Sequence, residues 1–226
     1  MIQELFKSSH CIIETFPIGA LQCNTTCVYD PSSKEAIIID PGFDNPKLIE
    51  YVTSKKLIVK KLLHSHAHFD HIGGSWELKK LWGTKNYLHP GDLYLYDNLA
   101  MQGRMFGFST TNPGPLEKDE YIEDNQEFTQ YNAGNLKIQA FHTPGHTPGS
   151  VSFFINCNGS EQPILLSGDT LFARSIGRTD LPGGDPQLII KSIKNRLFTL
   201  DECTLVVPGH GPLTSIFEEK RKNPFF

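Results

Sequence analysis

One short segment of the chain carries an unusual density of side chains that can bind metal. Between positions 64 and 71 it contains the pattern His-x-His-x-Asp-His, formed by His66, His68, Asp70 and His71. Imidazole and carboxylate groups suit zinc and the neighbouring transition metals. His66 and His68 point the same way in an extended segment, because side chains alternate along a strand. Asp70 and His71 follow a change of chain direction and can face a second point, so the pattern predicts two metal ions side by side.

Three further candidate ligands lie where apolar runs end at glycine-containing turns. They are His146 in TPGHTPG, Asp169 in SGDT and His210 in PGHG. In layered α/β folds, functional groups gather just beyond the ends of strands. Taken singly, His146 or His210 is equally well explained as a hydrogen-bonded turn residue. Together with the motif, however, they exceed the four protein ligands that one tetrahedral zinc uses, which favours a shared binuclear centre.

The apolar and turn patterns predict strands and helices that could position these side chains. Strands are expected over 12–16, 26–29, 36–39, 58–63, 85–88, 134–141, 150–156, 163–167 and 204–207. Helices are expected over 45–55, 72–82, after Pro90, and over 186–200 and 215–222. Because helices accompany the strands in each half, the pattern suggests two sheets packed face to face with helices outside.

Length, composition and net charge limit the classes to which the protein can belong. The chain has 226 residues, of which 38% are hydrophobic and 20% charged, and a formal net charge of −4. This length suits one substantial core, so we expect a single domain over residues 1–226. The sequence lacks a basic nucleic-acid footprint and a membrane-spanning run, and we expect no signal peptide. We therefore expect neither nucleic acid nor a membrane as partner, and a monomer or small homo-oligomer.

The cysteines indicate a reducing compartment. Five are present without a Cys-x-x-Cys pair, which predicts reduced thiols in a cytoplasmic protein. Cys23 and Cys27 could be interpreted as a metal-binding pair, but no further ligand lies near them in the sequence.

On these residues the chain resembles the metallo-β-lactamase superfamily. Asp40, the His66–His71 motif, His146, Asp169 and His210 follow in the order of that family. The chain is most similar to glyoxalase II and its short relatives, on the stretches HTPGHTPG, SGDTLF, GRTD and PGHGP. Only residues 212–226 follow the last candidate ligand. We therefore expect the C-terminal helical domain that gives glyoxalase II its glutathione contacts to be absent, as in the short relatives with an Asn-Pro-Phe tail.

The resemblance implies both a fold and a set of site residues. The fold would be α/β (α+β), a four-layer αββα sandwich. The ligands of one metal would be His66, His68 and His146, and those of the other Asp70, His71 and His210, with Asp169 bridging. Asp40 would stand beside the ligands rather than bind metal. Two divalent ions are implied, with zinc expected and iron or manganese as alternatives.

The resemblance to glyoxalase II implies a binuclear metal-dependent hydrolase of thioesters such as S-lactoylglutathione. Two divalent ions about 3.5–4 Å apart can share a water and convert it to hydroxide near neutral pH. A thiolate leaving group needs little protonation, because a thiol has a pKa of about 8.5. Asp70 is the catalytic candidate, since it could accept a hydrogen bond from the hydroxide as well as bind metal. The sequence lacks a Gly-x-Ser-x-Gly motif, which disfavours a covalent route.

Other residues have less specific interpretations. Arg174 and Arg178 could hold a substrate carboxylate, although Arg178 could equally pair with Asp180 and brace its loop. Residues 103–120, with Met105, Phe106 and Phe108, form either a surface loop or a lid over the site. The remaining histidines are expected not to be ligands: His10, His64, His89 and His142.

Other functions of the same fold stay open. A mononuclear iron persulfide dioxygenase would use two histidines and one carboxylate, but it would not need the complete second set of ligands. A β-lactamase is disfavoured by Asp70, His71 and the bridging Asp169. The complete ligand set also argues against a non-catalytic binding module.

Overall fold

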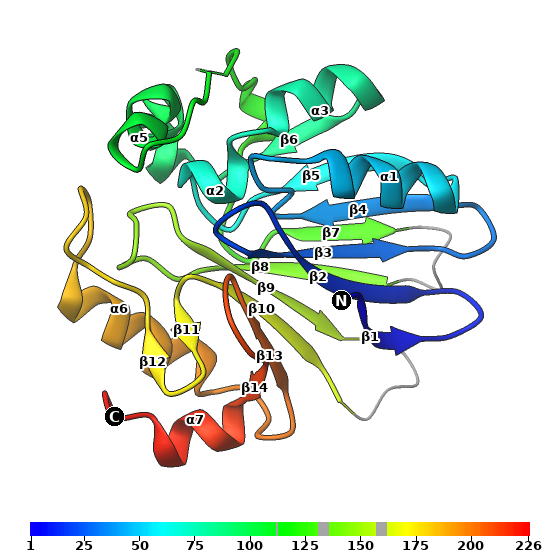
Figure 1. Cartoon of the computed structure of the whole chain (residues 1–226). Helices are drawn as coiled ribbons and strands as arrows, with labels where there is room; N and C mark the ends of the chain where they lie inside the picture. Colours follow the sequence, from blue (N-terminus) through cyan, green and yellow to red (C-terminus); the bar gives the residue numbers. More distant parts are fainter. Residues whose placement is uncertain (112, 131–135, 157–161) are drawn as a thin grey trace.

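Two six-stranded β-sheets pack face to face, and helices cover both outer faces (Figure 1). The structure is a computed structural model that describes residues 1–111, 113–130, 136–156 and 162–226. The layers therefore run helix, sheet, sheet, helix. This arrangement confirms the expected αββα sandwich.

The first sheet has the strand order β1-β2-β3-β4-β5-β6. Neighbours from β1 to β4 pair antiparallel, whereas β4, β5 and β6 run parallel. Its strands are β1 (Gln3–Lys7), β2 (Ile12–Ile18), β3 (Cys23–Tyr29), β4 (Glu35–Ile39), β5 (Ile58–Leu63) and β6 (Lys85–Tyr87). The parallel pairs place the carboxyl ends of β4 and β5 at one edge, where the His-x-His-x-Asp-His motif begins.

The second sheet has the strand order β14-β13-β10-β9-β8-β7. Its strands are β7 (Glu127–Gln130), β8 (Leu136–His142), β9 (Val151–Asn156), β10 (Ile164–Gly168), β13 (Leu205–Pro208) and β14 (Thr214–Ser215). A small hairpin of β11 (Leu171–Phe172) and β12 (Ser175–Ile176) follows β10. Strands β10 and β13 are parallel, so their carboxyl ends also meet at one edge.

Alternating side chains create the core on both faces of each sheet. In β4, Ile37 and Ile39 pack between the sheets, whereas Ile38 faces the outer layer with Leu48 and Leu78. In β10, Ile164 and Leu166 pack between the sheets, and Leu165 packs against Ile189 and Ile216 outside. Since both sheets bury both faces, near-continuous apolar runs such as 36–39 are expected there.

The helices form three groups around the sheets. Helices α1 (Pro46–Lys55) and α3 (Ser75–Trp82) cover the first sheet, and α6 (Pro186–Ser192) and α7 (Ile216–Lys222) cover the second (Figure 1). The third group lies near the motif: α2 (Phe69–Ile72), α4 (Leu93–Asp97) and α5 (Leu99–Met105). Short 3₁₀ turns span Pro90–Asp92 and Lys118–Glu120, and a π-helical segment spans Ile193–Leu197. Within the described ranges, no helix is long and apolar enough to cross a membrane.

The expected helix over 72–82 is confirmed over Ser75–Trp82, but its start is wrong, because Ile72 ends α2 and Gly73 and Gly74 separate the two helices. A Cβ on Gly73 would lie 2.3 Å from the carbonyl oxygen of Phe69, and one on Gly74 would lie 2.1 Å from Oδ1 of Asn45. The expected helix over 186–200 also changes form, since α6 continues as the π-helical segment. Strands β1, β7, β11, β12 and β14 were not predicted. Of the expected strand 134–141, residues 134 and 135 lie outside the described residues.

Candidate metal centre

The candidate ligands come together at the edge where β5, β8, β10 and β13 end, on the left in Figure 1. Three overlapping groups each have their ligand atoms within 4.8 Å of one another. The groups are His66, His68 and His146; Asp70, His71 and His210; and His66, His71 and Asp169. The seven predicted ligands are therefore brought into one centre. None of these groups, drawn from the described residues, includes Cys23 or Cys27.

Three imidazoles form the first group. His68 Nδ1 lies 3.0 Å from His66 Nε2 and 2.9 Å from His146 Nε2. His66 and His146 are buried, and His68 is half-buried. Nitrogen lone pairs aimed at one point repel each other unless a proton or a cation lies between them. The arrangement therefore has the chemistry of a cation site.

Two imidazoles and a carboxylate form the second group. His71 Nε2 lies 3.1 Å from His210 Nε2, and Asp70 Oδ2 lies 3.1 Å from the same His210 atom. Helix α2 explains why Asp70 and His71 face a different point from His66 and His68, because it begins directly after His68. The predicted change of direction within the motif is this strand-to-helix turn.

Asp169 lies between the two groups. Its Oδ1 is 3.4 Å from His71 Nε2, and its Oδ2 is 3.6 Å from His146 Nε2. Oδ1 is buried without a hydrogen-bond partner in the described part of the chain. A buried unpaired carboxylate oxygen is costly unless an ion or water compensates it. This orphaned oxygen, between two clusters of imidazoles, fits a metal-bridging carboxylate.

In four of the candidate ligand imidazoles, the ring nitrogen that faces away from the centre contacts a protein oxygen. Nδ1 of His146 contacts the carbonyl oxygen of Arg178 at 2.7 Å, and Nδ1 of His210 contacts that of Leu21 at 2.9 Å. Nδ1 of His66 contacts Ser65 Oγ at 3.0 Å, and Nδ1 of His71 contacts Asp40 Oδ2 at 3.1 Å. Such contacts place the proton on Nδ1 and leave Nε2 free to bind metal.

Asp40 organises ligands of both groups. Its Oδ2 accepts the hydrogen bond from His71, and also one from Ser65 Oγ at 2.6 Å, which in turn contacts His66. Its Oδ1 accepts from the backbone N–H of Ser65 at 2.7 Å. Asp40 has a φ of +49°, a region that non-glycine residues rarely adopt and that clusters at functional sites. Its place beside the ligands agrees with the sequence-based expectation.

Asp92 is a second organising carboxylate, and the sequence analysis missed it. Its Oδ2 accepts hydrogen bonds from Ala67 N at 2.9 Å and Thr147 Oγ1 at 2.8 Å, and its Oδ1 accepts from Gly149 N at 2.6 Å. It thereby joins the loop that carries His66 and His68 to the loop that carries His146. The only sequence signal at Asp92 is an acid after Pro-Gly, which is common at helix starts.

Burial and mutual repulsion shape the charges of the centre in the absence of metal. Burial and the neighbouring imidazoles lower the pKa of His66 well below its usual range and that of His68 to about 3. Burial would also lower the pKa of His71, but anionic neighbours that include Asp169 and Asp70 hold it well above its usual range. Burial would raise the pKa of Asp169, yet His71 and His146 hold it far below the ordinary carboxyl value. Neutral imidazoles and ionised carboxylates are the forms that bind metal, so His66, His68 and Asp169 are in the binding form, whereas His71 must release a proton when it binds metal.

A cleft opens onto the centre. His68, Asp70, His146 and Asp169 line it together with Leu21, Phe69, Gln102, Phe106, Arg178 and Leu181. Asp70 therefore belongs to the second group and also lies at the surface that a substrate would reach.

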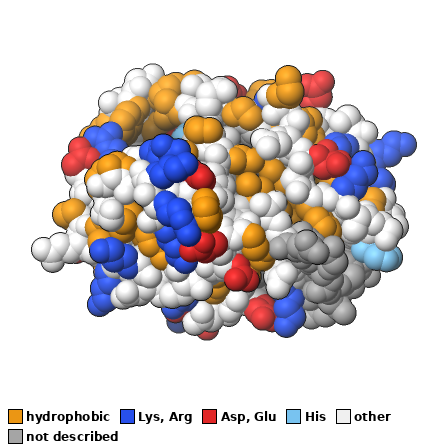
Figure 2. All heavy atoms as spheres, turned by 90° about the horizontal axis from the view of Figure 1, so that it is seen from below, with side chains coloured by type: hydrophobic (Ala, Val, Ile, Leu, Met, Phe, Trp, Pro, Cys, Tyr) orange, Lys and Arg blue, Asp and Glu red, His pale blue; other side chains and the backbone are white. Residues whose placement is uncertain are grey.

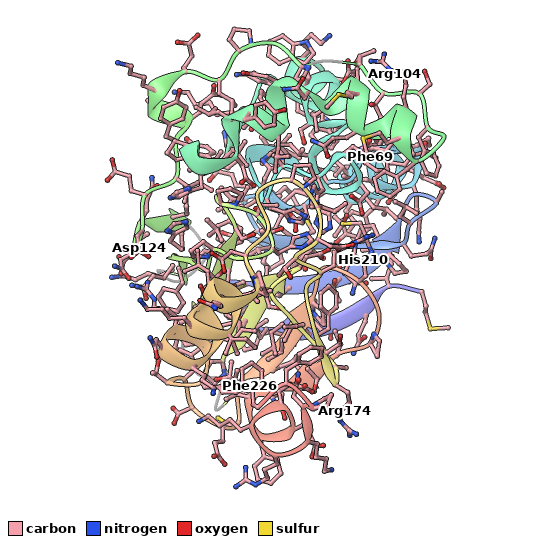
Figure 3. All side chains as sticks on the ribbon, turned by 90° about the vertical axis from the view of Figure 1, so that its left-hand side faces the viewer. Phe69, Arg104, Asp124, Arg174, His210 and Phe226 are labelled. Atoms are coloured by element: carbon pink, nitrogen blue, oxygen red, sulfur yellow. The ribbon has the colours of Figure 1, made fainter. Side chains whose placement is uncertain are left out.

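The structure places the two candidate arginines differently. Arg178 lines the cleft, but its guanidinium makes two contacts of 2.7 Å with Asp180, as the alternative interpretation expected. Arg174 does not line the cleft, and its side chain contacts Glu218 of α7 at 3.4 Å. Figure 3 shows Arg174 on the side of Phe226, apart from His210. On the face seen in Figure 2, basic and acidic side chains lie side by side. In α7, Lys222 and Glu218 form an ion pair at 2.8 Å.

The other histidines make contacts outside the centre. His64 is buried between Ser75 Oγ, at 2.6 Å, and the carbonyl oxygen of Tyr87, at 2.9 Å. His89 and His142 stack with ring centroids 4.0 Å apart.

The segment 103–120, apart from residue 112, which lies outside the described residues, is partly folded onto the motif. Phe106 and Phe108 pack against Phe69, with centroids 5.6 and 5.5 Å apart. Phe106 lines the cleft, as a lid residue would, whereas Met105 is 67% exposed. The segment thus contributes Phe106 to the wall of the cleft.

Comparisons with known proteins identify the family. The model of the metallo-beta-lactamase superfamily matches residues 18–210. The hydroxyacylglutathione hydrolase GloC of Haemophilus influenzae is 36% identical over 214 residues, which cover 94% of this chain and 97% of that protein. The probable metallo-hydrolase YqgX of Bacillus subtilis is 37% identical over 211 residues, which cover 92% of this chain and 94% of that protein.

Solved structures share the fold over nearly the whole chain. BLEG-1, a B3 metallo-beta-lactamase, is 38% identical with a TM-score of 0.83, covering 94% of this chain and 98% of that one. TTHA1623 in a di-iron-bound form is 36% identical with a TM-score of 0.79, covering 93% and 98%. ETHE1 from Myxococcus xanthus is 27% identical with a TM-score of 0.68, covering 99% and 83%. The centre, the fold and these matches agree, and the chain belongs to the metallo-β-lactamase superfamily, whose members include metal-dependent hydrolases.

Proposed function

We propose that this chain is a binuclear metal-dependent hydrolase whose substrates are thioesters. The observation that carries the proposal is the position of Asp169 between two complete sets of candidate ligands. The name of the GloC relative, a hydroxyacylglutathione hydrolase, supports the thioester class. S-lactoylglutathione is accordingly the first substrate to test.

In this proposal each metal has its own ligand set. His66, His68 and His146 would hold the first ion and Asp70, His71 and His210 the second, with Asp169 placed to serve both. Zinc suits these ligands, and iron is an alternative that the di-iron form of TTHA1623 supports. Manganese is the other alternative.

When bound, two divalent ions supply an activated water near neutral pH and polarise a carbonyl group. The protein contributes the positions of the reacting groups. Asp70 lines the cleft and can accept a hydrogen bond from the attacking water, and Asp40 and Asp92 keep the ligand loops in place. A thiolate leaves without a strong general acid because a thiol has a pKa of about 8.5. The weak need for a general acid agrees with the cleft, because most of its titratable groups are candidate metal ligands.

The deciding experiment is steady-state kinetics on metal-loaded protein with S-lactoylglutathione, a second acyl thioester of similar size and a chromogenic cephalosporin. We expect release of free thiol from both thioesters and slow or absent cephalosporin hydrolysis. Cephalosporin turnover without thiol release would instead place the chain with its BLEG-1 neighbour. Oxygen uptake with glutathione persulfide is measured on the same sample. Oxygen uptake without thiol release would support a mononuclear iron persulfide dioxygenase, an alternative with which the ETHE1 likeness is compatible.

A further inference from the structure

An uncharged apolar groove lies beside the candidate metal centre. Tyr94 and Leu95 of α4, Met101 and Met105 of α5, and Leu181 and Pro182 of the loop before α6 line it. Among the described residues that line it there is no Asp, Glu, Lys or Arg. Arg104, although part of α5, is not one of them. A groove of this composition favours an uncharged ligand, because moving a charge into apolar surroundings is costly.

The groove exposes large apolar side chains that no element of the described chain covers fully. Tyr94 and Met105 are each 67% exposed, Phe106 is 47% exposed and Met101 is 43% exposed. Contiguous apolar exposure of this kind marks binding surfaces in folded proteins. Methionine side chains are flexible and polarisable, so they can adapt to chains of different length.

The groove adjoins the cleft at the metal centre. His68, Gln102, Phe106 and Leu181 line both. For a molecule whose carbonyl lies near Asp70 and Asp169, the groove is therefore the neighbouring apolar surface, on the other side of these shared residues. Arg178 lines the cleft but not the groove, so the two ends of a substrate would meet different surroundings.

We propose that the groove binds the acyl chain of the substrate, and that the preferred thioesters carry an unbranched apolar acyl chain longer than a lactoyl group. This inference rests on the proposed thioester hydrolysis. The acyl arm is favoured over the thiol arm because soluble carrier thiols bear carboxylates or phosphates, which the groove leaves without a partner. Those charged arms would lie toward Arg178 and solvent.

Two ligand series test the proposal on metal-loaded protein. The first consists of N-acetylcysteamine thioesters with acetyl, butyryl, hexanoyl and octanoyl groups, assayed by thiol release. We expect kcat/KM to rise roughly two- to fourfold per added methylene while the chain remains in the groove. The second consists of the matching thioethers, which lack the scissile carbonyl, and their affinities are measured by calorimetry. These affinities should rise in parallel.

Substitutions inside and outside the groove test whether the groove causes the preference for long acyl chains. The double variant Met101→Gln and Met105→Gln keeps helix-forming residues of similar size at exposed positions, so the fold should persist. We expect its octanoyl-to-acetyl ratio of kcat/KM to fall about tenfold or more. The control is Leu81→Gln on α3, which is 58% exposed and does not line the groove. Its ratio should equal that of the unmodified protein.

The outcomes separate this inference from the proposed function. If thioesters are hydrolysed but neither series depends on chain length, the acyl groove is refuted while the hydrolase assignment stands. If no thioester is hydrolysed, the proposed function fails, and the substrate class inferred here fails with it. An unchanged ratio in the Met101/Met105 double variant would likewise refute the groove, even if longer acyl chains were preferred.

Discussion

Asp40 and His71 are joined by a hydrogen bond of 3.1 Å between Oδ2 of the carboxylate and Nδ1 of the imidazole. The same oxygen accepts a hydrogen bond from Ser65 Oγ, which contacts His66. One carboxylate thus fixes the orientation of an imidazole in each proposed metal site. Asp40 can influence both metals although it is not a proposed ligand of either.

The first prediction follows from this double contact. Asp40→Asn should lower the affinity for both metals by roughly 10- to 100-fold, because the amide nitrogen cannot accept the hydrogen bonds that the carboxylate accepts. Metal affinity is measured by competition with a chelator. Asp44→Asn, at an exposed position nearby, is the matched control. Equal affinities in all three proteins would contradict the positioning role.

The second prediction concerns stoichiometry. Fully loaded protein should hold close to two metals per chain, because the ligand set exceeds what one tetrahedral ion uses. His210→Ala should reduce the content toward one metal and lower turnover strongly. His142→Ala should keep both metals, since Nε2 of His142 contacts the carbonyl oxygen of Pro148 at 2.9 Å rather than the centre. Elemental analysis that finds one metal in the unmodified protein, whatever the metal supplied, would contradict the binuclear assignment.

The third prediction concerns Asp92. Asp92→Asn places an amide group opposite the N–H donors of Ala67 and Gly149, so at least one buried donor loses its acceptor. The cost should be about 1–3 kcal/mol in the free energy of unfolding, accompanied by weaker binding of the metal that His66, His68 and His146 would hold. Urea unfolding and metal titration test this. Asp97→Asn, exposed on α4, should change neither quantity.

The contrast between Asp40 and Asp92 shows what the sequence could and could not predict. Asp40 ends an apolar strand, and its place beside the ligands was expected from the resemblance to the metallo-β-lactamase superfamily, in whose order of residues it precedes the His66–His71 motif. Asp92 has no such signal, because its partners are a backbone N–H 25 residues before it and two groups more than 50 residues after it. Contacts of this range depend on how two loops meet in space.

The strands and helices show the same difference between what the sequence could and could not predict. Buried strands such as β4 and β10 were predicted because their apolar runs reflect burial on both faces. The break between α2 and α3 was not predicted. Gly73 and Gly74 are required there because Phe43 and Asn45 approach closely from another loop. Strand β1 was also missed. It lies at the edge of the first sheet, and its exposed or half-buried residues show little pattern.

The fourth prediction concerns stability at acid pH. Burial would raise the pKa of Glu14, but Lys55 and Tyr51 hold it below its ordinary value of 4.5. Lys55 Nζ lies 2.8 Å from Oε2 of Glu14, and Tyr51 donates a hydrogen bond to the same oxygen. A carboxyl whose pKa is lowered by folding stabilises the protein above its unfolded pKa, and this contribution is lost as the pH falls through the folded pKa.

Glu14→Gln should therefore be less stable than the unmodified protein at about pH 6, and this difference should shrink toward about pH 3.5. Thermal unfolding of metal-free protein is the measurement, because removing the metal eliminates the pH dependence of metal binding from the comparison. Glu50→Gln, exposed on α1, is the control. A difference that stays constant across this pH range would contradict the assigned pKa direction.

The fifth prediction concerns Gly209, which leaves space for Asp169. A Cβ at Gly209 would lie 2.1 Å from Oδ1 of Asp169 and 2.7 Å from Cε1 of His71, so Gly209→Ala must displace the proposed bridging carboxylate. We expect loss of at least one metal and a fall in turnover of about 100-fold or more, since a misplacement of about 1 Å can cost that much. Gly211→Ala controls for strain in the same loop: its added Cβ would meet nothing within 4 Å, although its φ of +76° disfavours alanine. Elemental analysis and thiol-release kinetics on both variants decide the matter. If Gly209→Ala kept two metals and the turnover of Gly211→Ala, Asp169 could not be the bridge between the two metals.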